Sequence, residues 1–212
     1  SSWRRRLRQD YLEWSTPQSH PGDIQLGEVV RSLRDELPAD TIIANGAGNY
    51  TSWLHRHHCY RFLGCQLGPT SGSMGYGLPA AIAAKLLKPK RTTIAFAGDG
   101  CFLMTGQEMA TAVQYQLPLV VILINNGMYG TIRMHQEIRY PTRVSGTDLV
   151  NPDFCLLANA YGAYAERVEE TMEFVPALRR ALAENRPSLI ELIVDPDAIS
   201  SNQTLTHIRA MA

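Results

Sequence analysis

Short apolar runs of β-prone residues alternate along the chain with segments of helical periodicity. Apolar side chains on both faces of a strand are typical of a parallel sheet that is covered by helices on either side. A length of 212 residues with 45% hydrophobic content is enough for one such domain. We expect a three-layer α/β/α fold with a mostly parallel sheet of about six strands. The runs that predict strands cover residues 41–44, 92–97, 119–124, 163–168 and 189–194.

The segments between these runs carry apolar side chains at helical spacing. One of them follows Thr105 and Glu108, which have the spacing of a capping box, in which two side chains satisfy free backbone N–H groups at a helix start. Another carries Pro79 in its first turn, where proline is tolerated. We expect helices over residues 26–37, 78–87, 106–116 and 174–182.

The balance of charge argues against several classes of partner. The chain has twenty Lys and Arg residues and twenty Asp and Glu residues, so its net charge does not indicate a nucleic acid or an anionic membrane surface as a partner. No apolar run reaches the roughly 18 residues that a membrane span needs. We therefore expect a soluble, cytoplasmic protein. The four cysteines form no Cys-x-x-Cys pair, and we expect all of them to be reduced and mostly buried: Cys59, Cys65, Cys101 and Cys155.

The two ends of the chain lie outside the alternating pattern. Residues 1–21 combine basic side chains with aromatic residues at helical spacing, and we interpret them as a linker helix from a missing upstream region rather than a surface-binding arm. The chain begins with Ser1 instead of Met, which fits a piece of a longer protein. The domain itself is assigned to residues 22–196, and residues 197–212 to a C-terminal tail.

Polar residues follow two consecutive strand-like runs at the point where each run ends. Asp99 follows one run, between two glycines, and Asn126 follows the next. In a parallel sheet, ligands bind outside the carboxyl ends of the strands. One βαβ unit would bring both side chains to the same edge of the sheet, where their oxygens suit a hard cation such as Mg²⁺.

One carboxylate and one amide are too few ligands to hold Mg²⁺ alone, because the ion keeps waters and takes further ligands from phosphate groups. The pair therefore predicts a phosphate-bearing ligand. Gly98 and Gly100 would let the backbone approach that anion without a Cβ, and a helical turn starting near Cys101 would present free N–H groups. Either polar residue alone is common in an ordinary turn, so the prediction depends on the pair.

The spacing of this pair resembles a known motif. Gly98-Asp99-Gly100, then 24 residues, then Asn125-Asn126 resembles the thiamine diphosphate motif of thiamine-dependent enzymes. The segment from Gly72 through Met74 to Ala81 resembles the one under the thiazolium ring in the acetolactate synthase branch. The resemblance extends from about Gly22 to Pro196 and covers only the C-terminal, cofactor-binding domain of an enzyme that typically has three domains.

The resemblance implies roles for individual residues. Mg²⁺ would be bound by Asp99, Asn126 and the backbone carbonyl of Met128. The side chain of Met74 would hold the cofactor in its bent form, and the carbonyl of Gly72 would accept a hydrogen bond from the aminopyrimidine. The further cofactor contacts that it implies are Gly48, Asn49, Tyr50, Gly98, Gly100, Cys101, Tyr129 and Gly130.

In function, the resemblance implies an enzyme that decarboxylates a 2-oxo acid and ligates the resulting enamine to a second carbonyl compound. A simple 2-oxo acid decarboxylase of the benzoylformate or indolepyruvate type shares the same motifs. His135 stands where anabolic acetolactate synthases commonly carry Trp, which leaves the substrates open. A non-catalytic nucleotide-binding module is a reading from another class, although the turn at residues 46–51 lacks the third glycine of a dinucleotide fingerprint.

The same resemblance implies parts that this sequence lacks. A glutamate that hydrogen-bonds the cofactor pyrimidine comes from a separate pyrimidine-binding domain, of the same chain or another, and active sites form between subunits of a homo-oligomer. The resemblance also leaves open an FAD-binding middle domain. We therefore expect the isolated chain to bind cofactor weakly and to catalyse little.

Two other polar segments are interpreted as structural. His55-Arg56-His57-His58 offers no facing ligand set on a helix or strand and has no carboxylate nearby, so a metal site there is disfavoured. Asp148 and Asn151 flank a turn, and we interpret them as helix-entry residues rather than catalytic ones.

Overall fold

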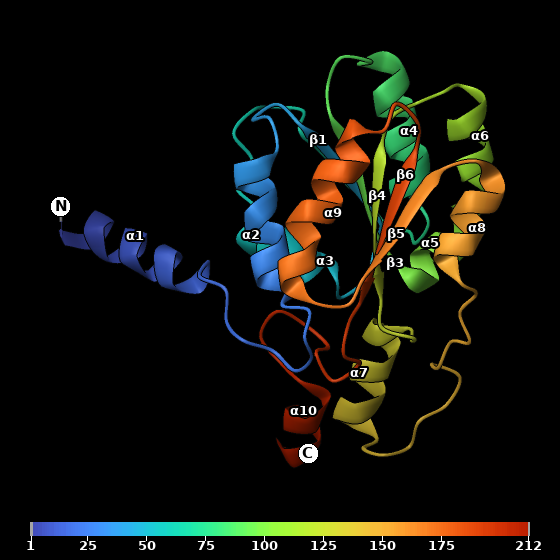
Figure 1. The fold of residues 1–212 in the computed structure, drawn as a ribbon. Helices are drawn as coiled ribbons and strands as arrows, with labels where there is room; N and C mark the ends of the chain where they lie inside the picture. Colours follow the sequence, from blue (N-terminus) through green and yellow to red (C-terminus); the bar gives the residue numbers. More distant parts are fainter. Residues whose placement is uncertain (1, 212) are drawn as a thin grey trace.

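A six-stranded sheet, parallel throughout, forms the centre of the structure, a computed structural model that describes residues 2–211 (Figure 1). The strand order is β2-β1-β3-β4-β6-β5. The predicted α/β class, the parallel sheet and the number of strands are confirmed. Strand β2 has two residues, too few to stand out as a pattern in the sequence. The strands are β1 (Ile42–Asn45), β2 (Gln66–Leu67), β3 (Thr93–Gly98), β4 (Val120–Asn125), β5 (Tyr164–Val168) and β6 (Ser188–Ile193).

Helices cover both faces of the sheet, as the apolar runs predict. Helices α2, α3 and α9 pack on one face, while α4, α6 and α8 pack on the other (Figure 1). Helices α7 and α10 lie together beyond one edge of these layers. The helices are α1 (Ser2–Trp14), α2 (Leu26–Glu36), α3 (Thr51–His57), α4 (Gly77–Leu87), α5 (Asp99–Thr105), α6 (Met109–Gln114), α7 (Gly130–Arg139), α8 (Phe154–Tyr161), α9 (Thr171–Ala183) and α10 (Leu205–Met211).

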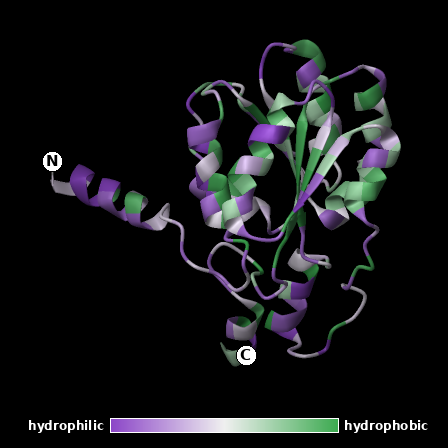
Figure 2. Cartoon of the chain, viewed as in Figure 1, coloured by the Kyte–Doolittle hydropathy of each residue, from purple (hydrophilic) through white to green (hydrophobic). Residues whose placement is uncertain are grey.

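Alternate residues of the central strands supply two separate hydrophobic cores. In β4, Ile122 faces the core under α2 and α9, and its neighbour Leu123 faces the core under α4 and α8. Both side chains are fully buried, which follows from the two-residue side-chain period of a strand. Figure 2 shows hydrophobic residues along the strands and mostly hydrophilic residues on α1. The burial of two apolar faces fixes the sheet and therefore the loops at its carboxyl edge.

The helix predicted over residues 106–116 is wrong in detail. A 3₁₀ turn over residues 106–108 separates α5 from α6. The side chain of Thr105 donates to the carbonyl of Gly75 over 2.7 Å, and Glu108 accepts from the Thr111 hydroxyl over 2.8 Å. The predicted capping box therefore does not form at this place. A capping box does form at the start of α9, between Glu170 and Glu173.

Strand β5 departs from the expectation that every strand is covered on both faces. It is one of the two edge strands of the sheet, and its first four residues are half-buried or exposed. Its charged side chains make ion pairs, Glu166 with Arg180 and Arg167 with Glu191. Charged residues on an edge strand discourage pairing with another chain.

The segments outside the alternating pattern are helical. Helix α1 extends away from the sheet and has no buried residue (Figure 1). The side chain of Arg56, in α3, donates to the backbone carbonyl of Trp14, the last residue of α1, over 2.6 Å. At the other end, α10 packs against α7 through the buried side chain of Ile208. Within residues 2–211, no helix combines the length and apolar character needed to cross a bilayer.

The cysteines are free, as predicted. Cys65 and Cys101 are buried and Cys155 is half-buried, but Cys59 is exposed. The expectation that they are mostly buried is therefore wrong for Cys59, which lies in the loop after α3.

Candidate functional site

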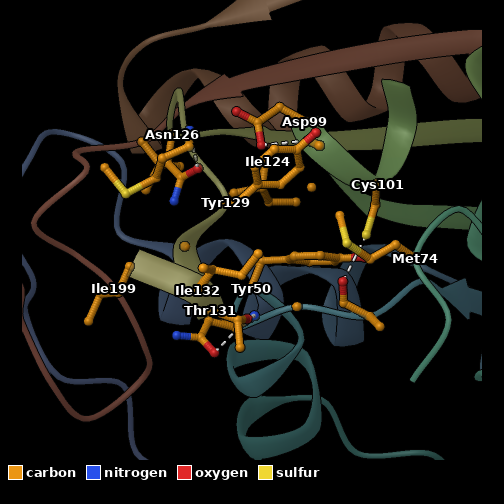
Figure 3. Close-up of a pocket in the computed structure, with 18 of the residues that line it drawn as sticks. Tyr50, Met74, Asp99, Cys101, Ile124, Asn126, Tyr129, Thr131, Ile132 and Ile199 are labelled. Carbon is orange, nitrogen blue, oxygen red and sulfur yellow. Dashed lines mark hydrogen bonds between the residues drawn. The ribbon is translucent and has the colours of Figure 1, made fainter. Parts of the chain in front are cut away.

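A pocket that is partly open to solvent lies where the chain leaves β1 and β3 (Figure 3). These two strands are neighbours, but the chain continues from them to opposite sides of the sheet, which makes their carboxyl ends a topological switch point. The lining includes Tyr50, Met74, Asp99, Asn126, Met128 and Thr131.

Asp99 and Asn126 come together in this pocket because their strands pair in parallel. Gly98 at the end of β3 lies opposite Ile124 of β4, so the residues that follow reach the same edge of the sheet. Asp99 is 3% exposed. Its Oδ1 accepts from the backbone N–H of Gly100 over 2.8 Å, and its Oδ2 accepts from that of Gly127 over 2.9 Å. Asp99 and Asn126 therefore both line this pocket, at the edge of the sheet where the sequence places them.

The carboxyl group of Asp99 has no cationic partner in the part of the chain that the structure describes. Burial raises its pKa, although hydrogen bonds from Asn151 and from the backbone of Gly100 and Gly127 act in the opposite direction. Within residues 2–211, no Lys, Arg or His lies within ion-pair distance of it. A buried carboxylate is costly unless a positive charge compensates it. This environment therefore suits a bound cation.

The neighbouring oxygens complete a donor set for a hard cation. Asn126 is half-buried, and its Oδ1 accepts one long hydrogen bond, 3.3 Å, from the backbone N–H of Met128. The Met128 carbonyl accepts from Gly130 over 3.0 Å and keeps a second lone pair. A carboxylate, an amide oxygen and a backbone carbonyl are the ligand types that Mg²⁺ takes. The residues present therefore fit this ion.

Two tyrosine rings fill the space beside the glycines of the site. A Cβ added at Gly98 would lie 2.8 Å from the ring of Tyr50, and one added at Gly100 would lie 2.6 Å from the ring of Tyr129. The glycines thus admit these rings, which the sequence pattern did not indicate. The hydroxyl of Tyr50 is buried without a hydrogen-bond partner in the described structure, and burial raises its pKa.

The turn after β1 is tied to the start of α7. The backbone N–H of Asn49 donates to the hydroxyl of Thr131 over 3.0 Å, and that hydroxyl donates to Asn49 Oδ1 over 2.9 Å. Gly48, Asn49 and Gly130 also line the pocket. The thiol of Cys101 lines it as well and donates to the carbonyl of Ala47 over 2.8 Å.

Met74 and Gly72 lie on different sides of this turn. Met74 is half-buried, lines the pocket and packs against the core under α2. Gly72 is exposed, has a φ of +66° and lines an adjoining groove with Gly48. The structure therefore groups every predicted site residue except Gly72 in the main pocket.

Asn151 corrects one prediction, because it is not a helix-entry residue. The N-cap of α8 is Asp153, whose side chain accepts from the backbone N–H of Leu156 over 2.9 Å. Asn151 instead donates through Nδ2 to Asp99 Oδ2 over 2.9 Å. Asp148 is not a helix-entry residue either, since its exposed side chain pairs with Arg133.

The histidine-rich segment holds no metal site in the described structure. His57 Nδ1 lies 3.0 Å from the carbonyl of Ser15. Within residues 2–211, the group of His, Cys, Asp and Glu side chains close enough to share an ion is Asp153, Cys155 and Glu191, but Arg167 already pairs with both carboxylates there. His135 is exposed and is not among the residues that line the pocket.

A parallel α/β sheet whose switch point carries a mainly apolar pocket with a few polar groups, Asp99 and Asn126 among them, is typical of ligand-binding α/β domains. Residues 46–192 match the family described as thiamine pyrophosphate enzyme, C-terminal TPP binding domain, and the chain belongs to this family. The resemblance to thiamine-dependent enzymes is thereby confirmed.

Two acetolactate synthase large subunits are among the proteins to which this chain is similar. The chain is 33% identical over 196 residues to the acetolactate synthase isozyme 2 large subunit of Escherichia coli K12, covering 91% of this chain and 36% of that protein. It is 37% identical to the acetolactate synthase large subunit of Corynebacterium glutamicum, with 84% of this chain and 30% of that protein covered. The chain spans about a third of the length of these relatives.

A solved structure is similar in fold. The thiamine diphosphate-dependent 4-hydroxybenzoylformate decarboxylase of Rhodococcus jostii RHA1 superposes with a TM-score of 0.78 at 31% identity. The match covers 84% of this chain and 34% of that one. The three-layer arrangement around the pocket is thus that of a thiamine diphosphate enzyme domain.

Proposed function

We propose that this domain binds thiamine diphosphate through a Mg²⁺ ion held by Asp99, Asn126 and the carbonyl of Met128. The observation that carries the proposal is the buried carboxylate of Asp99, which has no cationic partner among residues 2–211 and lines the same pocket as Asn126 in a chain of a thiamine pyrophosphate-binding family. A divalent ion would supply the missing positive charge, and a diphosphate would supply its remaining ligands.

The other residues of the pocket would orient the cofactor. The side chain of Met74, flexible and polarizable, would fill the gap inside the bent cofactor, and the carbonyl of Gly72 would accept from the aminopyrimidine. The diphosphate would lie against the turns that follow β1, β3 and β4. The residues of these turns and of the strand and helix ends beside them that line the pocket are Gly48, Asn49, Tyr50, Gly98, Gly100, Cys101, Tyr129 and Gly130.

For the whole protein we propose an acetolactate synthase-like activity, supported by the relatives of that name. The enzyme would decarboxylate a 2-oxo acid and join the remaining fragment to a second carbonyl compound. When bound, thiamine diphosphate supplies the electron sink that this decarboxylation needs. The residues of this chain would hold and orient the reacting groups, in a pocket that the apolar side chains of Ile124 and Ile199 also line.

The activity would require parts beyond this chain, which spans a third of its relatives. We propose a pyrimidine-binding domain from the same or a separate chain, a homo-oligomer with shared sites, and a cytoplasmic location. An FAD-binding middle domain in the complete protein is compatible with the similarity to these relatives.

A simple 2-oxo acid decarboxylase is the second candidate. It is favoured by the structural similarity to the 4-hydroxybenzoylformate decarboxylase. Thr131 and Ile132, in the first turn of α7, line the pocket. His135, which stands where anabolic acetolactate synthases commonly carry Trp, is exposed and does not line it.

Product analysis separates the two candidates. The complete protein is incubated with thiamine diphosphate, Mg²⁺ and either pyruvate or benzoylformate, and both CO₂ and organic products are measured. A carboligase forms a 2-hydroxy-3-oxo acid, whereas a simple decarboxylase forms the aldehyde. Saturable binding of NAD with no response to thiamine diphosphate would contradict both candidates and indicate a nucleotide-binding module.

A further inference from the structure

A buried glutamate interrupts the apolar strand β6. Glu191 is 1% exposed although it lies between Ile190 and Leu192, which are fully buried. Its Oε2 accepts from Arg167 Nε over 2.9 Å, and the thiol of Cys155 lies 3.6 Å from the same oxygen. A buried carboxylate destabilises a fold unless it is paired, so this one needs a structural or functional reason.

The second oxygen of Glu191 faces β4. Glu191 Oε1 accepts from Asn125 Nδ2 over 2.7 Å. An ionised carboxylate has no proton to donate, so the NH₂ group of the Asn125 amide must face Glu191 and its oxygen must face away. That oxygen then accepts from Asn151 Nδ2 over 2.8 Å and from the backbone N–H of Gly127 over 3.2 Å.

The orientation of Asn125 is passed on to Asp99. An amide NH₂ group has two hydrogens, and that of Asn151 gives one to Asn125 Oδ1 and the other to Asp99 Oδ2, over 2.9 Å. The N–H of Gly127 is likewise shared between the same two oxygens. A chain of oriented hydrogen bonds thus runs from Glu191 through Asn125 and Asn151 to Asp99.

We propose that Glu191 is a positioning residue for the cation site, acting through Asn125 and Asn151 to fix the rotation of the Asp99 carboxylate. The inference rests on the proposed function, since it assigns Asp99 to the cation. If the charge of Glu191 is removed, the Asn125 amide is free to turn over and present its NH₂ group to that of Asn151. Asp99 Oδ2 then loses one of its two donors and keeps only the N–H of Gly127, so the rotation of the carboxylate is fixed less tightly.

The test is a Mg²⁺ titration of the complete protein at saturating thiamine diphosphate, followed by tryptophan fluorescence and by calorimetry. We expect Glu191→Gln to raise the half-saturating Mg²⁺ concentration about 10- to 100-fold, the range found when groups that orient metal ligands are removed. Excess Mg²⁺ should restore the full binding signal. A merely structural role would lower the unfolding temperature and leave the half-saturating concentration unchanged.

Glu166→Gln is the matched control. Glu166, on the neighbouring edge strand β5, accepts from Arg180 of α9, so the variant also removes a carboxylate from a paired arginine. In the described structure no hydrogen bond links Glu166 to Asp99. We expect wild-type Mg²⁺ dependence for this variant. An equal rise in both variants would overturn the proposal, because it would trace the effect to net charge.

A second variant keeps the proposal testable if Glu191→Gln does not fold. Asn151→Ala removes the donor to Asp99 and leaves the pair of Glu191 with Arg167 intact. We expect a similar rise in the half-saturating Mg²⁺ concentration. In the double variant Glu191→Gln with Asn151→Ala, we expect a rise no greater than the larger of the two single effects, because both residues act through the same chain of hydrogen bonds. Additive effects would overturn the proposal.

Asp99→Ala, measured in parallel, separates the two claims. If Asp99→Ala binds with the same Mg²⁺ dependence as wild type, the proposed function itself is wrong. Loss of that dependence in Asp99→Ala, together with a wild-type response in Glu191→Gln and Asn151→Ala, would overturn only the positioning role.

Discussion

Asn151 Nδ2 donates to Asp99 Oδ2 over 2.9 Å, although 52 residues separate the two along the chain. The bond joins the loop before α8 to the start of α5 and lies at the pocket on the carboxyl edge of the sheet. Because Asp99 is buried and has no ion-pair partner in the described structure, such neutral donors hold its carboxylate in place.

A second buried carboxylate, Glu137 of α7, predicts how stability depends on pH. It accepts from Arg209 over 2.6 Å, from Arg133 over 3.0 Å and from the backbone of Thr142 over 2.9 Å. These donors, with Arg209 contributing most, lower the pKa of Glu137 from an ordinary 4.5 to about 2. As the pH falls from 4.5 to 2, the unfolded chain takes up this proton before the folded one, and stability is lost.

Glu137→Gln should therefore lower the free energy of unfolding by about 1–3 kcal/mol at pH 7, and the difference from wild type should shrink as the pH falls below 4.5. Urea denaturation at several pH values between 7 and 3 measures it. A difference that stays constant over this range would show that the ionised carboxylate is not what stabilises the contact of α7 with α10.

The close approach of Tyr129 to Gly100 predicts a steric effect. Gly100→Ala places a methyl group 2.6 Å from the ring, so the ring must move, at a cost of about 1–3 kcal/mol. Thermal unfolding should show the loss, and cofactor affinity should fall because Tyr129 lines the pocket. Gly68→Ala is the control, since its nearest neighbour would lie at 3.5 Å. Equal unfolding temperatures in the two variants would refute the predicted crowding.

The position of Met74 predicts a split between rate and affinity. Met74→Ala should reduce kcat at least about tenfold and change the Kd for the cofactor less than Asp99→Ala does, because the side chain shapes the cofactor rather than anchoring it. Steady-state kinetics and calorimetry of the complete protein check this. Met172→Ala, at an exposed position on α9, should match wild type in both. A loss of affinity as large as that of Asp99→Ala would assign Met74 an anchoring role instead.

Local signals in the sequence account for the parts of the structure that were predicted. The apolar runs predict five of the six strands, and the polar turns after them predict that Asp99 and Asn126 meet, because both follow from the order of neighbouring elements. No local signal predicts the 3₁₀ turn over residues 106–108, because Thr105, the residue before it, bonds to Gly75, which lies 30 residues away along the chain.

The supporting residues of the site depend on contacts between distant segments. Asn151 reaches Asp99 across 52 residues, and Glu191 reaches Asn125 across 66, so no local pattern reports them. One signal was available for Glu191, which is a charged residue inside an apolar run. The rings beside Gly98 and Gly100 depend on the packing of Tyr50 and Tyr129, which periodicity does not describe.

Calorimetric titration of the complete protein with thiamine diphosphate, in Mg²⁺ and in EDTA, tests the central claim most directly. We predict saturable binding that needs Mg²⁺ and that weakens by more than about 100-fold in Asp99→Ala and in Asn126→Ala, since each removes a ligand of the ion. Binding of equal strength in EDTA, or unchanged binding in Asp99→Ala, would contradict the account.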